Sequence, residues 1–121
     1  MSQSWQEYWD ELVDLLARHF DKKLVIFSPH ATVRMAERNI GRRVVRFVVE
    51  RNVPREMYGK FEYPHGATPY TNAHPVFSVT GQDMNGRWIT VAVAVMKRAE
   101  KLRFKIVTVI VVDEKSRHRN G

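Results

Sequence analysis

The chain of 121 residues contains no cysteine. Disulfide bonds, thiolate catalysis and sulfur-ligated zinc are therefore excluded. Long hydrophobic runs are also lacking, because the two longest, residues 89–96 and 106–112, are far too short to cross a bilayer as helices. The first residues soon turn acidic, unlike a secretory signal. We therefore expect a soluble, cytoplasmic protein with no membrane contact.

Motifs for metals, nucleotides and serine hydrolysis are absent as well. The five histidines are scattered, with no H-x-x-x-H or H-x-H spacing and few acids near them, so the sequence predicts no metal site. It holds no Walker A loop, no dinucleotide fingerprint and no G-x-S-x-G elbow. We expect no cofactor.

Acidic charge is scarce outside the N-terminal segment. The net charge is +7, while residues 1–20 hold four acids against one arginine, a local charge of −3. The remainder of the chain therefore carries +10. Such a basic body is typical of proteins with a polyanionic partner, and RNA is the partner that we expect. The alternative is a well-solvated basic surface without a ligand.

One capped helix stands out, over residues 29–39. Ser28 is a good N-cap, and the proline that follows it suits the first helical position. His30, Arg34 and Arg38 recur at four-residue steps and so share one helix face. Two interpretations remain open at this point. The row is either an anion-binding face with an imidazole for proton transfer, or a structural histidine beside arginines that pair with acids.

The rest of the pattern predicts one domain over residues 1–121. The expected elements are an amphipathic helix at 4–20, a short strand at 24–27, the capped helix at 29–39, a helix at 42–52, and strands at 58–63, 76–80, 87–97 and 102–113. Residues 42–52 are ambiguous, since their valines favour a strand, but their apolar residues also cluster at helical period. Residues 1–22 form an extension, 24–113 the core and 114–121 a polar, flexible tail.

The first helix carries Trp5 and Trp9 on one apolar stripe, so it must dock on something. Packing on the core of the same chain is the simpler interpretation. The alternatives are a lid over the basic body of the chain and a homodimer built through this helix.

Residues 28–40, S-P-H-A-T-V-R-M-A-E-R-N-I, closely resemble the S-x-H-A-x-x-R-M-x-x-R-x-I segment of small prokaryotic domains of unknown function. Those domains look related to the RelE/ParE and BrnT-like toxin superfamily. The resemblance covers residues 24–113 and implies a RelE-like α+β fold, with helices packed on one face of a four-stranded antiparallel sheet. The amphipathic N-terminal helix is an addition to that fold, and Asn39 stands where the family usually has glycine.

The resemblance also implies a metal-independent ribonuclease, of a toxin type that a cognate inhibitor protein restrains. Such cleavage needs a base, an acid, and cations for the phosphorane charge. Histidine suits either proton role, and arginine matches phosphate oxygens. The candidate catalytic residues are His30, Arg34, Arg38, Lys60 and His65, with His30 as base or acid, His65 as proton donor and the three cations on phosphate.

Further basic and aromatic residues are candidates for RNA contact. Tyr63 is expected to stack on a base. The basic residues of the expected phosphate track are Arg42, Arg43, Arg46, Lys97, Arg98, Lys101, Arg103 and Lys105. If they bind RNA, the affinity falls steeply with salt. The alternative, from another class, is a non-catalytic module that holds nucleic acid or protein with the same fold.

Overall fold

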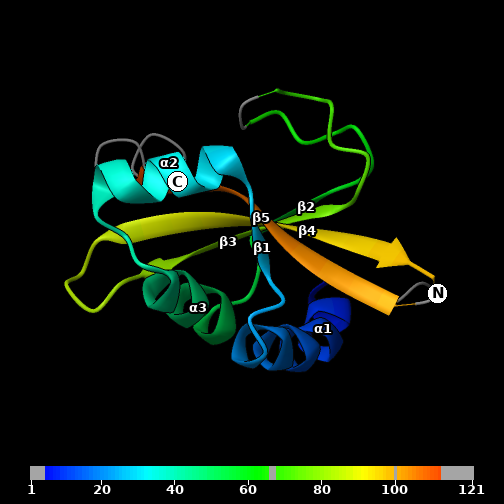
Figure 1. Ribbon diagram of the computed structural model, residues 1–121, viewed down its shortest axis with the longest axis horizontal. Coiled ribbons are helices and arrows are strands. Elements are labelled where there is room, and N and C mark those ends of the chain that lie inside the picture. Colours follow the sequence, from blue (N-terminus) through cyan, green and yellow to red (C-terminus); the bar gives the residue numbers. More distant parts are fainter. Residues whose placement is uncertain (1–4, 66–67, 100, 113–121) are drawn as a thin grey trace.

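A computed structural model describes residues 5–65, 68–99 and 101–112 of the chain (Figure 1). Its elements are α1 (Trp5–Asp21), β1 (Ile26–Phe27), α2 (Pro29–Arg38), α3 (Arg42–Arg51), β2 (Glu56–Tyr58), β3 (Val76–Gln82), β4 (Trp88–Arg98) and β5 (Lys101–Val112). The predicted tail at 114–121 and the side chain of Trp5 lie outside what the structure describes. None of the described helices is long and apolar enough to cross a membrane.

The strands form one five-stranded sheet in the order β1-β5-β4-β3-β2. β2 to β5 follow one another as an antiparallel meander, whereas β1 pairs with β5 in parallel. The mixed α+β class is confirmed, and the predicted sheet of four antiparallel strands is corrected to five strands with one parallel edge. β1 joins the sheet through only two residues, which is too short a run to reveal a pairing partner in the sequence.

The predicted strand at 58–63 is wrong. β2 ends earlier, and the chain turns at Phe61, whose φ is +62°. The Phe61 N–H donates to the Asn72 carbonyl oxygen at 2.7 Å, and the Tyr70 N–H donates to the Tyr63 carbonyl oxygen at 2.9 Å. The loop between β2 and β3 therefore folds back on itself and does not extend the sheet.

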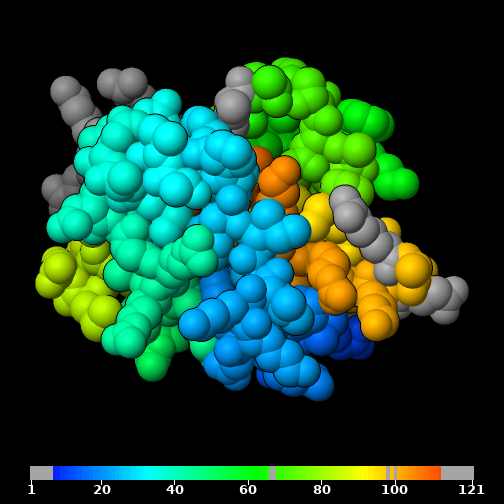
Figure 2. All heavy atoms as spheres, in the orientation of Figure 1, coloured from blue at the N-terminus to red at the C-terminus, as the bar shows by residue number. Residues whose placement is uncertain are grey.

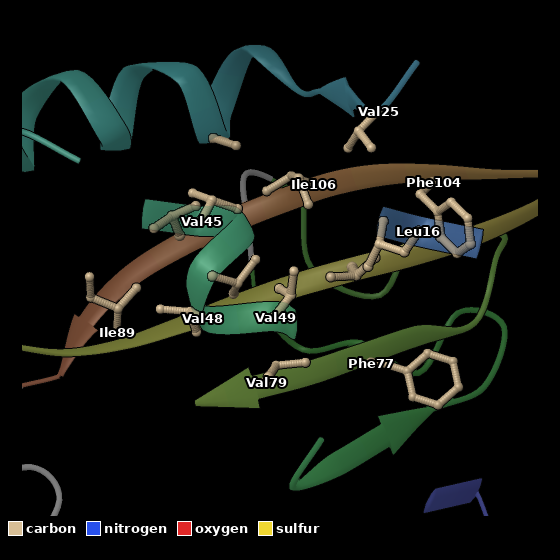
Figure 3. Close-up of a cluster of buried hydrophobic side chains, with 14 of the residues drawn as sticks. Leu16, Val25, Val45, Val48, Val49, Phe77, Val79, Ile89, Phe104 and Ile106 are labelled. Atoms are coloured by element: carbon tan, nitrogen blue, oxygen red, sulfur yellow. The ribbon is translucent and has the colours of Figure 1, made fainter. Parts of the chain in front are cut away.

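The helices α1 and α3 cover one face of the sheet, which we call the core face (Figure 1). Its buried strand residues are Phe77, Val79, Ile89, Val91, Val93, Val95, Phe104, Ile106 and Val109. Leu16 of α1 and Val48 of α3 pack against these residues (Figure 3). The segment at 42–52 is thus helical, because its valines bury one side at helical period.

The sequence predicted that α2 and α3 would cover one face and that α1 or a partner would cover part of the other. The prediction for α1 is wrong, because α1 packs on the core face beside α3. Trp9 is 1% exposed, and its ring centroid lies 5.0 Å from that of Phe77. The apolar stripe of α1 is covered within the chain, which confirms core packing for the described part of the stripe. A homodimer through α1 stays an untested alternative.

The helix α2 lies along the edge of the sheet beside β5 (Figure 1), and its buried Ala31 and Met35 belong to the same hydrophobic core as α1 and α3. Both of its ends are capped. The Ser28 hydroxyl accepts from the Ala31 N–H at 3.0 Å, and Asn39 ends the helix in the left-handed region with φ of +55°. Asparagine tolerates this conformation better than most residues, which explains why glycine is dispensable here.

Ser28 also fastens α2 to the sheet. Its hydroxyl donates to the carbonyl oxygen of Val107 at 2.8 Å, at the point where β5 holds one residue more than its partner strand. We expect Ser28→Ala to lower the free energy of unfolding by about 1–3 kcal/mol, because α2 loses its N-cap and the partly buried Val107 carbonyl loses its hydrogen-bond donor. Denaturant unfolding would show this, with Ser28→Thr as the control that keeps a hydroxyl. Equal midpoints for Ser28→Ala and the parent chain would contradict it.

His19, near the end of α1, is buried in an environment that disfavours its charge. Its ring lies edge-on to Phe104, with 5.2 Å between centroids. Burial, and then the positive charges of Arg103, Lys22 and Arg18, lower the pKa of His19.

A lowered pKa in the folded state means that the unfolded chain binds the proton first, so stability falls as the pH drops below about 6.5, the ordinary histidine pKa. We expect the free energy of unfolding to decrease from pH 7 to pH 5, and to decrease less in His19→Gln. An equal decrease in both proteins, measured by denaturant unfolding, would show that His19 does not contribute.

Candidate functional site

The face of the sheet turned away from α1 and α3, which we call the open face, carries the candidate site. Its strand residues include Ser78, Thr80, Thr90, Ala92, Ala94, Met96, Lys105 and Thr108. Two hollows of about 490 and 510 Å³ lie on it, between α2 and the described parts of the loop that follows β2, residues 59–65 and 68–75. Figure 2 shows part of β5, in orange, exposed between the cyan α2 and the green loop. Both hollows are lined by His30 and His65, so they adjoin there.

The smaller hollow, which we call the arginine hollow, is lined by the row of α2 residues that the sequence predicted, His30, Arg34 and Arg38. Its lining residues are His30, Arg34, Arg38, Pro64, His65, Pro69, Thr108, Val109, Ile110 and Val111. This row is offset by one residue from Ala31 and Met35, which are buried. The offset turns the row along β5 toward the open face, because neighbouring residues of a helix point about 100° apart.

His30 is held by the sheet. Its Nε2 lies 3.0 Å from the hydroxyl oxygen of Thr108, which is 1% exposed. The imidazole itself is half-buried and lines both hollows. The ring is therefore oriented by a buried partner and still meets solvent, the two properties that a proton-transferring histidine needs.

The two arginines differ in how firmly they are paired. Arg34 Nη1 lies 3.6 Å from Glu37 Oε2, with both side chains about half exposed. Such a surface pair is worth little, roughly 0–1 kcal/mol. Arg38 makes no side-chain hydrogen bond or ion pair within the described residues. Both guanidiniums can therefore turn toward an anion.

The end of α2 is anchored by an ion pair whose carboxylate is buried. The carboxylate of Asp83, whose side chain is 2% exposed, accepts from Arg87 Nε at 2.9 Å. Arg87 Nη1 then donates to the carbonyl oxygen of Arg38 at 2.7 Å. Hydrogen bonds from backbone N–H groups of the turn and from Arg87 outweigh the effect of burial and lower the pKa of Asp83. This connection fixes the backbone from which Arg38 projects.

The larger hollow, which we call the loop hollow, lies between the start of α2 and the loop. Its lining residues are Ser28, Pro29, His30, Tyr63, His65, Thr68, Thr71, Asn72, Ala73, His74, Ala94, Met96, Lys105 and Val107. No acidic side chain from the described part of the chain lines either hollow. Three histidines, two arginines and one lysine instead give the site a basic character, which favours an anionic ligand.

The structure brings together most of the candidate catalytic residues. Four of them, His30, Arg34, Arg38 and His65, line the arginine hollow. Lys60 does not, because it lies in the exposed turn after β2 and lines neither hollow. The predicted strand that would have aligned it with His65 does not form.

Tyr63 lines the loop hollow as part of its buried floor. Only 3% of it is exposed, and its ring packs edge-on against Tyr58, with 5.2 Å between centroids. Burial also raises the pKa of its phenol. The predicted stacking of Tyr63 on a base is corrected accordingly, since its ring face is already covered by protein.

The arginines of α3 lie apart from the hollows, since α3 covers the core face. The Arg42 guanidinium sits over the phenylalanine ring of β1, 4.6 Å from its centroid. Arg46 is bonded to Asp21 at 2.7 Å and to Glu50 at 2.8 Å. Arg43 is exposed on the same helix. The predicted phosphate track is therefore not continuous, because these arginines do not lie on the open face.

The basic residues of the last hairpin are divided between the two faces. The strand register turns Lys101, Arg103 and Lys105 toward the open face and Lys97 toward the other. Of these four, Lys105 lines a hollow. The side chain of Arg98 lies outside the described residues.

Thr108 and Asn72 are among the lining residues that the sequence did not predict as site residues. Thr108 could have been noticed, since it is the one polar residue in an otherwise apolar run at 106–112. Asn72 gave no such signal, because polar residues are ordinary in loops.

The fold and the hollows define a small α+β domain with a basic groove between a helix and a loop. A family model described as Domain of unknown function (DUF4258) matches residues 27–111, which is more than half of the chain, and the chain belongs to that family. The match includes every lining residue of both hollows and leaves out α1. Comparisons with curated proteins and with solved structures give no significant match.

Proposed function

We propose that the protein is a metal-independent ribonuclease that cleaves RNA where the two hollows meet. The observation that carries this proposal is the joint position of His30, Arg34 and Arg38 in one solvent-accessible hollow. A protein with one oriented imidazole and two unburied guanidiniums can supply proton transfer and charge stabilisation without a metal. Kinship with the RelE/ParE and BrnT-like toxins, and restraint by a cognate inhibitor protein, belong to the same proposal.

In this proposal His30 is the general base. Thr108 accepts a hydrogen bond from Nε2–H, which leaves the lone pair of Nδ1 to take the proton of an RNA 2′-hydroxyl. The 2′-oxygen then attacks phosphorus and the bond from phosphorus to the 5′-oxygen breaks. His65, which lines both hollows, donates the proton that this leaving oxygen needs. The products are a 2′,3′-cyclic phosphate and a 5′-hydroxyl.

The arginines stabilise the charge that develops during the attack. Arg34 and Arg38 stand one and two turns beyond His30 along α2. Their forked N–H groups match the oxygens of a phosphate, and they carry charge at every relevant pH. An anionic phosphorane beside them would be stabilised in the transition state.

The test is RNA cleavage in the presence of EDTA. We expect single-stranded RNA to be cut into fragments with 2′,3′-cyclic phosphate and 5′-hydroxyl ends. Cleavage that stops when metal is removed, or fragments with 5′-phosphate ends, would contradict the mechanism. Binding of RNA without any cleavage would favour a non-catalytic binding module, which the structural bond between His30 and Thr108 also allows.

Arg38→Ala should weaken RNA binding by roughly tenfold and reduce the slope of log affinity against log salt by about 1, because one phosphate contact is lost. The measurement is titration with 2′-O-methyl RNA, which cannot be cleaved, at about 50 to 200 mM salt. Arg43→Ala is the matched control, since Arg43 is an exposed arginine on α3, away from the hollows. Equal losses in both variants would contradict a specific role for Arg38.

A further inference from the structure

The two adjoining hollows differ in chemistry. The arginine hollow is rimmed by cations, whereas the loop hollow has an apolar floor that includes Ala94 and Met96. Its volume of about 510 Å³ lies within the usual range of small-ligand pockets. An apolar floor beside a phosphate site is what a nucleobase requires, because its faces are apolar and its edges are polar.

The polar groups on the wall of the loop hollow are oriented. Asn72 Oδ1 accepts from the His74 backbone N–H at 3.2 Å, and the Asn72 carbonyl oxygen accepts from Phe61. The side-chain amide is therefore placed with its oxygen toward the backbone, and its Nδ2 amino group is left to donate. Within the described residues, Nδ2 of Asn72 has no hydrogen-bond partner.

Lys105 adds a second donor to the same hollow. It projects from β5 on the open face and makes no ion pair with a described residue. An ammonium group has three N–H donors and no acceptor. Asn72 and Lys105 thus leave two sets of donors unmatched, whereas the side-chain oxygen of Asn72 already accepts from the His74 N–H.

We propose that the loop hollow is a nucleobase pocket that selects bases with carbonyl oxygens on their edge, uracil and guanine, over cytosine and adenine. Uracil offers O4, and guanine offers O6 and N7, as acceptors. Cytosine and adenine present an amino group at the corresponding position, which would face Asn72 and Lys105 donor to donor. A base can enter such a pocket only when it is unstacked, so the ligand is single-stranded RNA.

The shared boundary at His30 and His65 places this base next to the phosphate at which cleavage is proposed. The inference rests on the proposed function for that phosphate. Recognition of the base itself needs no cleavage, so the two can be tested separately.

The experiment is binding of uncleavable 2′-O-methyl oligonucleotides of equal length, oligo-U, oligo-C and oligo-A, to the full chain at one salt concentration. We expect oligo-U to bind at least about tenfold more tightly than oligo-C or oligo-A, the usual size of one base contact. Asn72→Asp keeps an oxygen for the His74 N–H and replaces the donor with a second acceptor. It should reduce the ratio of oligo-U to oligo-C affinity to within about twofold, even though its negative charge weakens both.

Equal binding of the three oligonucleotides, or an unchanged ratio in Asn72→Asp, would overturn the base pocket. Cleavage products mapped on RNA of mixed sequence separate the two proposals. Cuts placed equally beside all four bases would remove the base pocket and keep the ribonuclease. A uracil preference in binding without any cuts would remove the ribonuclease and keep the pocket.

Discussion

Replacement of His30 by glutamine should reduce the rate of RNA cleavage by about 10²–10⁴-fold, the usual contribution of a general acid or base. The glutamine amide reaches the position of the histidine Nε2 and can still form a hydrogen bond with Thr108, so the packing of α2 on β5 is preserved. It cannot accept a proton near neutral pH. The rate at saturating RNA and the free energy of unfolding, measured on the same preparation, separate loss of chemistry from loss of structure.

Three further results decide the role of His30. Thr108→Val keeps the volume of the threonine and removes the hydrogen bond to the imidazole, so it should cost less activity than His30→Gln. Full activity in His30→Gln would exclude the proposed base. A His30→Gln protein that no longer folds would favour the structural interpretation, in which the imidazole exists to hold α2 on the sheet.

The helices were predictable from the sequence because their signals are local. The predicted range 29–39 for α2 differs from Pro29–Arg38 by one residue, since a capping serine and a left-handed asparagine mark its ends. The α3 segment was predicted as a helix by its apolar period, despite four valines that favour a strand. Periodicity and caps depend on residues that are close in the chain, so they can be read from the sequence.

The pairing of β1 and the course of the loop were not predictable in this way. β1 depends on two residues that meet β5 about eighty positions later in the chain. In the loop, Phe61 and Tyr70 adopt φ of +62° and +63°, a region that bulky residues rarely enter. Both residues donate backbone hydrogen bonds across the loop, to Asn72 and Tyr63, and the local sequence preference of a bulky residue does not predict these conformations.

The candidate site shows the same difference between local signals, which the sequence reveals, and contacts between distant segments, which it does not. The row His30, Arg34 and Arg38 followed from helical spacing alone, and the structure does place these residues in one hollow. The opposite wall, with Asn72 and His74, exists only because the loop folds back over the open face. On the loop side, only His65 was both predicted as a catalytic residue and found in the arginine hollow, so the helical side of the site was the more predictable one.

The helix α1 presents a different question, because it lies outside residues 27–111 that define the family and yet forms part of the core. Its Trp9 is 1% exposed and packs against Phe77 in β3. The indole Nε1 of Trp9 is buried with no hydrogen-bond partner among the described residues. An unpaired buried N–H costs about 1–3 kcal/mol, so the stabilisation by this residue comes from its ring surface.

Trp9→Ala should therefore lower the free energy of unfolding by about 3–5 kcal/mol, the usual cost of removing a buried aromatic ring. Trp9→Phe is the matched control: it keeps an aromatic ring against Phe77 and removes the unpaired N–H, so it should cost much less than the alanine variant. Both values come from denaturant unfolding followed by circular dichroism. A loss below about 1 kcal/mol in Trp9→Ala would mean that α1 rests loosely on the sheet, since that is the range of surface substitutions. A large loss would make α1 an integral layer that this chain adds to the core face of the family domain.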